Sequence, residues 1–365
     1  MSSPKNLLAI ALPIFKIWKY SGLPVYYVPP KCSYFAVGVH VVNVVVYMMF
    51  VGVQKTIYSS VCLLQIGSVV AQNIGLIFFT YKNKNNIESI FVDLVSVESS
   101  LSLLSKNKLI FVKVVKYLAI YTTTQFLWMT STTIINIYIG FNNSYQVIFV
   151  VCYLAAQVYN FNLDLLLFLI LLVMREFFAK LIFLIRTDAS LGTRLNDVVN
   201  IYSSLYNLNV KVLKSFEGLL LLKIFSDCIG SATSIFYGFY ALMVLETGLW
   251  VYCMIVLGLL FFQAAIWTSE ICLTTLFGNL STQGFSFFEE LDEMITRRKT
   301  FATPSYKFLE GLSLRLRNES NVFQVYGLFP INCTLIYSMA VAIVTYLTYL
   351  VQFTQKDVIS SDKFM

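Results

Sequence analysis

The sequence predicts an all-α, polytopic membrane protein with seven transmembrane helices in a single domain, residues 1–365. Of the 365 residues, 58% are hydrophobic and only 12% are charged, whereas about a quarter of a soluble domain is charged. The mean hydropathy is +0.74. Long apolar runs recur along the chain, and polar segments that carry most of the lysine and arginine separate them. Helices suit such a chain because each satisfies its own backbone hydrogen bonds in lipid.

The apolar runs are long enough to cross a bilayer, for which about 20 residues suffice. The expected spans are 34–53, 56–80, 113–140, 147–174, 219–245, 249–277 and 331–353. The fourth run stays largely apolar as far as Ile185. A helix of that length measures about 58 Å at 1.5 Å per residue and must extend well beyond the hydrocarbon core.

The segments between the spans are expected to lie mostly on one side of the membrane. Leu7–Phe15 is apolar but too short to cross, so we interpret it as an interfacial helix. Polar residues dominate 81–112, 187–218 and 279–326. In the last of these, an amphipathic helix is predicted from Leu309, Leu312, Leu316 and Phe323. We expect the inner extensions of the fourth to sixth helices, together with this segment, to form a cytosolic assembly domain.

Orientation follows from the distribution of basic residues, which favour the cytosolic side. With the N-terminus inside, only Lys55, Lys356 and Lys363 of the 26 lysines and arginines fall outside. The sequence therefore predicts an inner N-terminus and an outer C-terminus. A rhodopsin-type receptor has the opposite orientation. A carrier would show an internal repeat of helices, and the sequence has none.

Other classes of function find no support in the sequence. The chain has a single histidine, His40, and no phosphate-binding loop or nucleophile elbow. Six of the seven cysteines lie in apolar segments, where buried thiols are ordinary. We therefore expect no enzyme activity, cofactor, metal site or nucleic-acid partner.

The last span carries a stripe of polar residues. Projected at about 100° per residue, its polar side chains fall near one line. They are Thr334, Ser338, Thr345, Thr348 and Gln352, with Tyr349 beside them. Such a stripe should face another helix or water rather than lipid.

The same span carries a motif. It consists of Thr345-Tyr346, then five mostly apolar residues, then Gln352-Phe353. The motif resembles the C-terminal signature of insect gustatory receptors. Gly327-Leu-Phe329 and Asn332 resemble the lead-in to that family's last helix. The resemblance implies a ligand-gated, non-selective cation channel in the plasma membrane of a sensory neuron. It also implies a homotetramer, or a hetero-oligomer with related receptors, whose last helices line the pore. Insect odorant receptors share the topology but lack the full signature, and a metabotropic seven-helix receptor is the next alternative.

The resemblance places the gate at the outer end of the last span. Gln352 and Phe353 would form it, and Tyr349, Thr345 and Thr348 would line the approach. The alternative is that Gln352 bonds a neighbouring helix and Phe353 anchors the interface. Asp357, just outside, would form a carboxylate ring in a tetramer or act as an isolated tail residue.

A ligand pocket should open to the outside, between the outer halves of the second to sixth helices. The candidates are aromatic residues and hydrogen-bonding residues in those halves. They are Trp128, Thr132, Asn136, Tyr153, Gln157, Tyr237, Tyr240, Trp250 and Met254. Aromatic walls with few polar groups suit a small amphipathic tastant, and a bitter plant compound more than a sugar. The alternative is that these residues form interfacial belts.

Charged residues near the inner ends of the spans form a further group. Charges in the membrane are costly unless paired, and Lys223 and Asp227 can pair as i and i+4 neighbours. We expect a structural salt-bridge cluster there, with a gating switch as the alternative. Its expected members are Asp164, Asp227, Glu270, Lys113, Lys116 and Lys223.

Overall fold

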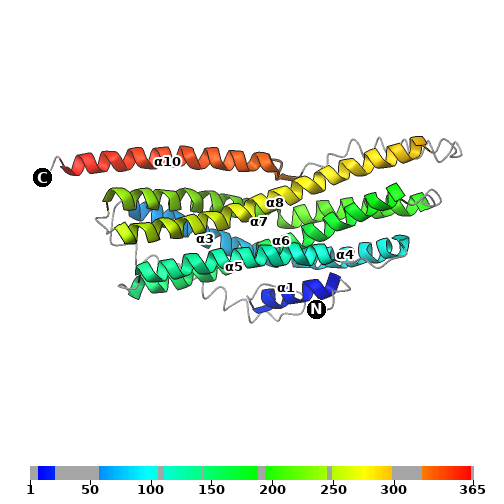
Figure 1. Ribbon diagram of the computed structural model, residues 1–365, viewed down its shortest axis with the longest axis horizontal. Coiled ribbons are helices and arrows are strands. Elements are labelled where there is room, and N and C mark those ends of the chain that lie inside the picture. Colours follow the sequence, from blue (N-terminus) through cyan, green and yellow to red (C-terminus); the bar gives the residue numbers. More distant parts are fainter. Residues whose placement is uncertain are drawn as a thin grey trace.

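The fold is a bundle of long helices whose axes run nearly parallel (Figure 1). The computed structural model describes residues 7–20, 57–105, 111–140, 144–187, 194–244, 249–297 and 323–362. The span expected over 34–53 and most of the amphipathic segment before the last helix lie outside these ranges. At each of the six other expected spans the structure contains a helix.

Six helices correspond to the expected spans. They are α3 (Ile57–Lys82), α5 (Val112–Gly140), α6 (Ser144–Thr187), α7 (Leu195–Val244), α8 (Leu249–Arg297) and α10 (Cys333–Asp362). Within the described residues, three stretches are long and apolar enough to cross a membrane: Asn196–Tyr240, Trp250–Glu293 and Cys333–Phe353. That all seven expected spans cross a membrane remains a prediction.

The helices α6, α7 and α8 are much longer than a membrane crossing needs. They contain 44, 50 and 49 residues, which corresponds to about 65–75 Å of helix against about 30 Å of hydrocarbon. The sequence predicted the length of α6. It did not predict that α7 begins at Leu195, because 187–218 looked polar and mixed. Buried Val198, Tyr202 and Leu205 explain the extension, since they give this helix an apolar face on the bundle.

Residues 81–112 were expected to be a polar connection, and most of that segment is helical instead. Helix α4 (Lys84–Ser105) follows α3 after a turn at Asn83. One face of α4 is buried and the other is polar. The buried side chains recur every three or four residues, and they are Ile87, Ile90, Leu94, Val97, Leu101 and Leu104. Polar composition concealed this periodicity, which is the usual sign of an amphipathic helix.

The expected N-terminal helix is present as α1 (Leu7–Tyr20). Its buried side chains, Leu7, Ile10 and Ile14, belong to the same apolar core as those of α4 and α6. The Leu7 N–H donates a hydrogen bond of 3.5 Å to Glu98 Oε1 on α4. Burial raises the pKa of the Glu98 carboxyl above its ordinary value, and the bond from Leu7 opposes that rise. Helix α1 therefore packs on the bundle beside α4 and α6.

Helices α3 and α7 approach each other closely at two glycines. A Cβ added at Gly75 would lie 2.1 Å from Leu222 Cδ1, and one added at Gly218 would lie 2.6 Å from the Phe79 ring. Small residues allow such approach between membrane helices, where packing is a main source of stability.

A short antiparallel hairpin precedes α10. Strand β1 (Gln324–Val325) pairs with β2 (Phe329–Pro330) through a turn at Tyr326 and Gly327, whose φ angles are 48° and 68°. A left-handed conformation costs a non-glycine residue roughly 1–2 kcal/mol. Asn332 then caps α10, because its Oδ1 accepts the Thr334 N–H at 3.0 Å.

Candidate functional site

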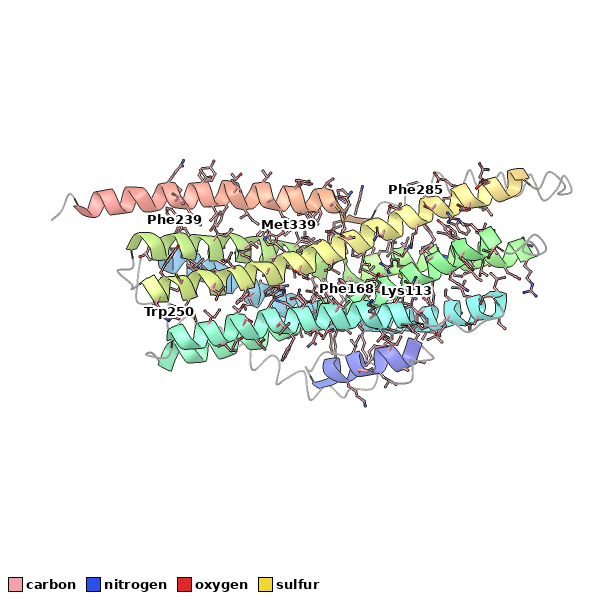
Figure 2. All side chains as sticks on the ribbon, in the orientation of Figure 1. Lys113, Phe168, Phe239, Trp250, Phe285 and Met339 are labelled. Carbon is pink, nitrogen blue, oxygen red and sulfur yellow. The ribbon has the colours of Figure 1, made fainter. Side chains whose placement is uncertain are left out.

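Helix α10 has two opposite faces. Leu335, Met339, Ile343 and Leu350 are all less than a tenth exposed and pack toward α7 and α8. Figure 2 shows Met339 pointing from α10 into the bundle. The polar stripe, defined as Thr334, Ser338, Thr345, Thr348 and Gln352, is exposed throughout. The centres of the two sets lie roughly 140° apart around the helix at 100° per residue, so the stripe faces away from its own subunit.

The candidate gate residues share the exposed side of α10. Tyr349 and Phe353 are 58% and 56% exposed, and Gln352 is exposed as well. The hydroxyls of Thr345 and Thr348 donate to carbonyls one turn earlier, at 2.8 and 2.9 Å. The structure therefore brings all five predicted pore residues onto a surface that the subunit leaves free. The side chain of Asp357 lies outside the described residues.

The predicted ligand residues divide into separate groups. Trp128 of α5 packs against Phe261 of α8 with ring centroids 5.4 Å apart. Its Nε1 is buried and has no hydrogen-bond acceptor among the described residues. Thr132, one turn later, donates its hydroxyl to the Trp128 carbonyl at 2.9 Å. These two residues therefore lie together at the α5–α8 contact.

The tyrosines of α7 lie on another side of the bundle. Tyr237 and Tyr240 pack beside Phe236 in a small apolar cluster with Val61 of α3 and Leu350 of α10. These two tyrosines therefore lie where α7 packs against α10, the candidate pore helix.

The remaining ligand candidates form no described cluster. Trp250, at the start of α8, is 69% exposed, and Met254 is half-buried. The side chains of Asn136, Tyr153 and Gln157 lie outside those that the structure describes.

A buried ionic cluster lies in the middle of the bundle. Lys223 Nζ is 2.5 Å from Asp227 Oδ2, 2.8 Å from Glu270 Oε1 and 3.6 Å from Asp164 Oδ1. The side chains of Lys223, Asp164 and Glu270 are less than a tenth exposed, and that of Asp227 is 14% exposed. The local pair predicted from the sequence therefore belongs to a cluster that joins α6, α7 and α8.

Two hydroxyls extend this cluster to a fourth helix. Ser269 Oγ donates to Asp164 Oδ2 at 2.6 Å, and the Tyr121 hydroxyl of α5 donates to the same oxygen at 3.3 Å. The Tyr121 ring stacks on Phe168 at 4.2 Å, near the centre of the bundle in Figure 2. Sequence reasoning missed Tyr121 and Ser269, because single hydroxyl residues carry no signal among so many others. Lys113 and Lys116 are exposed and do not join the cluster, which corrects the expectation.

Amide side chains bind neighbouring helices in the same region. Asn160 of α6 donates to Gln72 of α3 at 3.1 Å, and Gln125 of α5 donates to the Ala265 carbonyl of α8 at 3.0 Å. Gln263 of α8 donates to the Ser231 carbonyl of α7 at 2.8 Å and accepts the Trp267 Nε1–H at 3.1 Å. Such bonds hold membrane helices together.

Comparison with known proteins identifies the family. The chain matches the family model described as 7tm chemosensory receptor over residues 30–357. Its structure is similar to that of the insect olfactory receptor OR5 from Machilis hrabei, with a TM-score of 0.72 and 13% identity over 95% of this chain and 98% of that chain. The structure of the same receptor in complex with eugenol has a TM-score of 0.70, also at 13% identity over the same shares of the two chains.

No curated protein matches the chain. At 13% identity the structural match establishes the fold, and the family model, which covers most of the chain, establishes the family. The family is a class of chemosensory receptors and not a class of enzymes, and the long apolar helices among the described residues are those of a membrane protein. The chain belongs to the 7tm chemosensory receptor family.

Proposed function

We propose that this protein is a subunit of a ligand-gated, non-selective cation channel of the gustatory type, opened by a small organic tastant. The observation that carries the proposal is the exposed polar stripe of α10, which faces away from the subunit while the opposite face packs on α7 and α8. A membrane helix can present such a stripe to water or to another subunit, but not to lipid without cost. In a symmetric homotetramer the four stripes would surround one axis and line a path for cations.

The gustatory assignment rests on the Thr345-Tyr346…Gln352-Phe353 signature. The side chains available to a ligand are consistent with an aromatic, sparsely polar compound. Gln125, Gln263 and Trp267 already bond within the bundle, whereas the Trp128 Nε1–H has no acceptor among the described residues. A sugar needs a partner for each hydroxyl. The similar olfactory receptor is known in complex with eugenol, which is a ligand of the same general chemistry.

The test is recording from excised membrane patches of cells that express the protein, with a panel of alkaloids, coumarins, phenolics including eugenol, and sugars. Channel opening in a patch without cytosol or added nucleotide supports the proposal. A response in whole cells that disappears in every excised patch would favour a metabotropic receptor instead.

Topology gives a separate prediction. We expect an epitope tag after Met365 to be labelled on intact cells and a tag before Met1 to be labelled only after permeabilisation. The reason is that 23 of the 26 lysines and arginines fall on the side of the N-terminus in this arrangement. Labelling of the N-terminal tag on intact cells would contradict the proposed plasma-membrane topology.

A second prediction concerns the ligand. We expect Trp128→Ala to raise the half-maximal concentration of the activating compound about tenfold and to change the maximal current little. The change removes an aromatic wall and its free donor, and interactions of this kind are worth about 1–2 kcal/mol. Phe126→Ala is the matched control, because Phe126 lies on the same helix and is 64% exposed. An identical concentration dependence in both variants would place the ligand elsewhere.

A further inference from the structure

The turn of the hairpin before α10 contains a tyrosine in an unusual conformation. The Leu328 N–H donates to the Val325 carbonyl at 2.8 Å, and Tyr326 and Gly327 between them both have positive φ angles. This geometry is that of a type I′ turn, whose central positions favour Gly, Asn and Asp. Gly327 fits its position, but Tyr326 does not, so a further interaction must hold it there.

That interaction comes from α7. A carboxylate oxygen of Glu217 accepts the backbone N–H of Tyr326, across 109 residues of sequence. An ionised acceptor makes a stronger hydrogen bond than a neutral one. Glu217 is only half-buried, and no ion pair to it is found among the described residues. The carboxylate therefore stabilises the hairpin turn and takes no part in the packing of the core.

The hairpin and the start of α10 form one unit that is docked on the bundle. Val325 is fully buried and Ile331 is 3% exposed. The Phe323 ring packs on Phe277 of α8 with centroids 5.3 Å apart, and the Ile331 N–H donates to the Phe323 carbonyl at 2.8 Å. Asn332 caps the helix immediately afterwards. If the hairpin turn moves, the first helical turn of α10 should therefore move with it.

We infer that Glu217 is a positioning residue for α10, which it ties to α7 through the Tyr326 N–H. This inference rests on the proposed channel function. Lys223, the centre of the ionic cluster, lies six residues further along α7, about 9 Å along the helix axis. One rigid helix therefore carries both the cluster that joins α6, α7 and α8 and the tether of the pore-helix candidate. The tether fixes the start of α10 relative to α7, so its loss should shift the equilibrium between the closed and the open channel.

The experiment measures ligand-free current and open probability at equal surface expression. We expect Glu217→Ala to change both about tenfold, a coupling of ordinary size between two sites. Glu217→Gln keeps an acceptor oxygen and should have a clearly smaller effect. Asp197→Ala is the matched control, because it removes an exposed acidic side chain from the same helix and should resemble the wild type.

A second measurement does not depend on current. In the purified full-length receptor, hydrogen exchange of the hairpin peptide, residues 323–332, should be faster in Glu217→Ala than in the wild type and in Asp197→Ala. Faster exchange with unchanged gating would overturn the positioning role, as would unchanged exchange. If the wild type responds to ligand but Glu217→Ala gates normally, only this inference fails. If the wild type carries no current in any condition, the channel proposal fails, and this role fails with it.

Discussion

Replacing Lys223 with methionine is expected to remove most of the receptor from the cell surface. The side chain is 4% exposed and is the one cation within 4 Å of Asp164, Asp227 and Glu270 among the described residues. Breaking a buried ion pair by removing one partner costs on the order of 3–5 kcal/mol, because the remaining charge is left uncompensated. Three carboxylates would lose their counter-charge here, at the point where α6, α7 and α8 meet.

The matched control is Lys211→Met on the same helix. Lys211 pairs with Asp93 of α4, but the two side chains are 33% and 45% exposed. Exposed pairs contribute about 0–1 kcal/mol, so this variant should retain near-normal surface levels. The measurement is surface biotinylation together with the melting temperature of the detergent-solubilised protein.

A rescue distinguishes the charge from the shape of the side chain. Adding Asp227→Asn to Lys223→Met removes one uncompensated carboxylate and should restore part of the surface expression. Equal expression of the Lys223 and Lys211 single variants would mean that the ionic cluster does not support the fold.

Phe353→Ala is expected to raise current in the absence of ligand several-fold or more. In the proposed tetramer Phe353 and Gln352 recur as rings at one end of the pore. Large side chains at a constriction exclude hydrated cations when the pore is closed, and smaller ones allow water and ions to enter. Both residues are exposed on the subunit, so truncation should cost little folding energy.

Gln352→Glu tests the same ring by charge. Four carboxylates in the ion path should raise the relative permeability of calcium or introduce block by divalent cations. The measurement is the reversal potential under asymmetric sodium and calcium, with surface expression recorded in parallel. The matched control is Tyr337→Ala, because Tyr337 lies on the same helix and is 76% exposed but is far from the proposed gate.

The alternative for the gate residues is packing against neighbouring helices. In that case both Phe353→Ala and Gln352→Glu would lower surface expression and leave selectivity unchanged. Normal surface levels with normal basal current and selectivity would remove both residues from the pore.

The sequence by itself determined the class of the protein and most of the helices. Composition and long apolar runs were sufficient, because a polytopic helical protein repeats one strong signal along the chain. It also determined the polar stripe of α10, because residues spaced three or four apart lie on one face of a helix whatever its tertiary contacts. The pairing of Lys223 with Asp227 was predictable for the same reason.

Only the tertiary structure decided which faces meet. The sequence grouped Asp164 and Glu270 with Lys223, but it also included Lys113 and Lys116, which stay outside the cluster. It could not show that Tyr121 and Ser269 bind Asp164, because these residues come from different helices. It also could not show that Tyr237 and Tyr240 pack beside Val61 of α3 and Leu350 of α10. The contact of Glu217 with Tyr326 was likewise hidden. Helical periodicity defines a face from local spacing, but the partner of that face depends on the packing of the whole bundle.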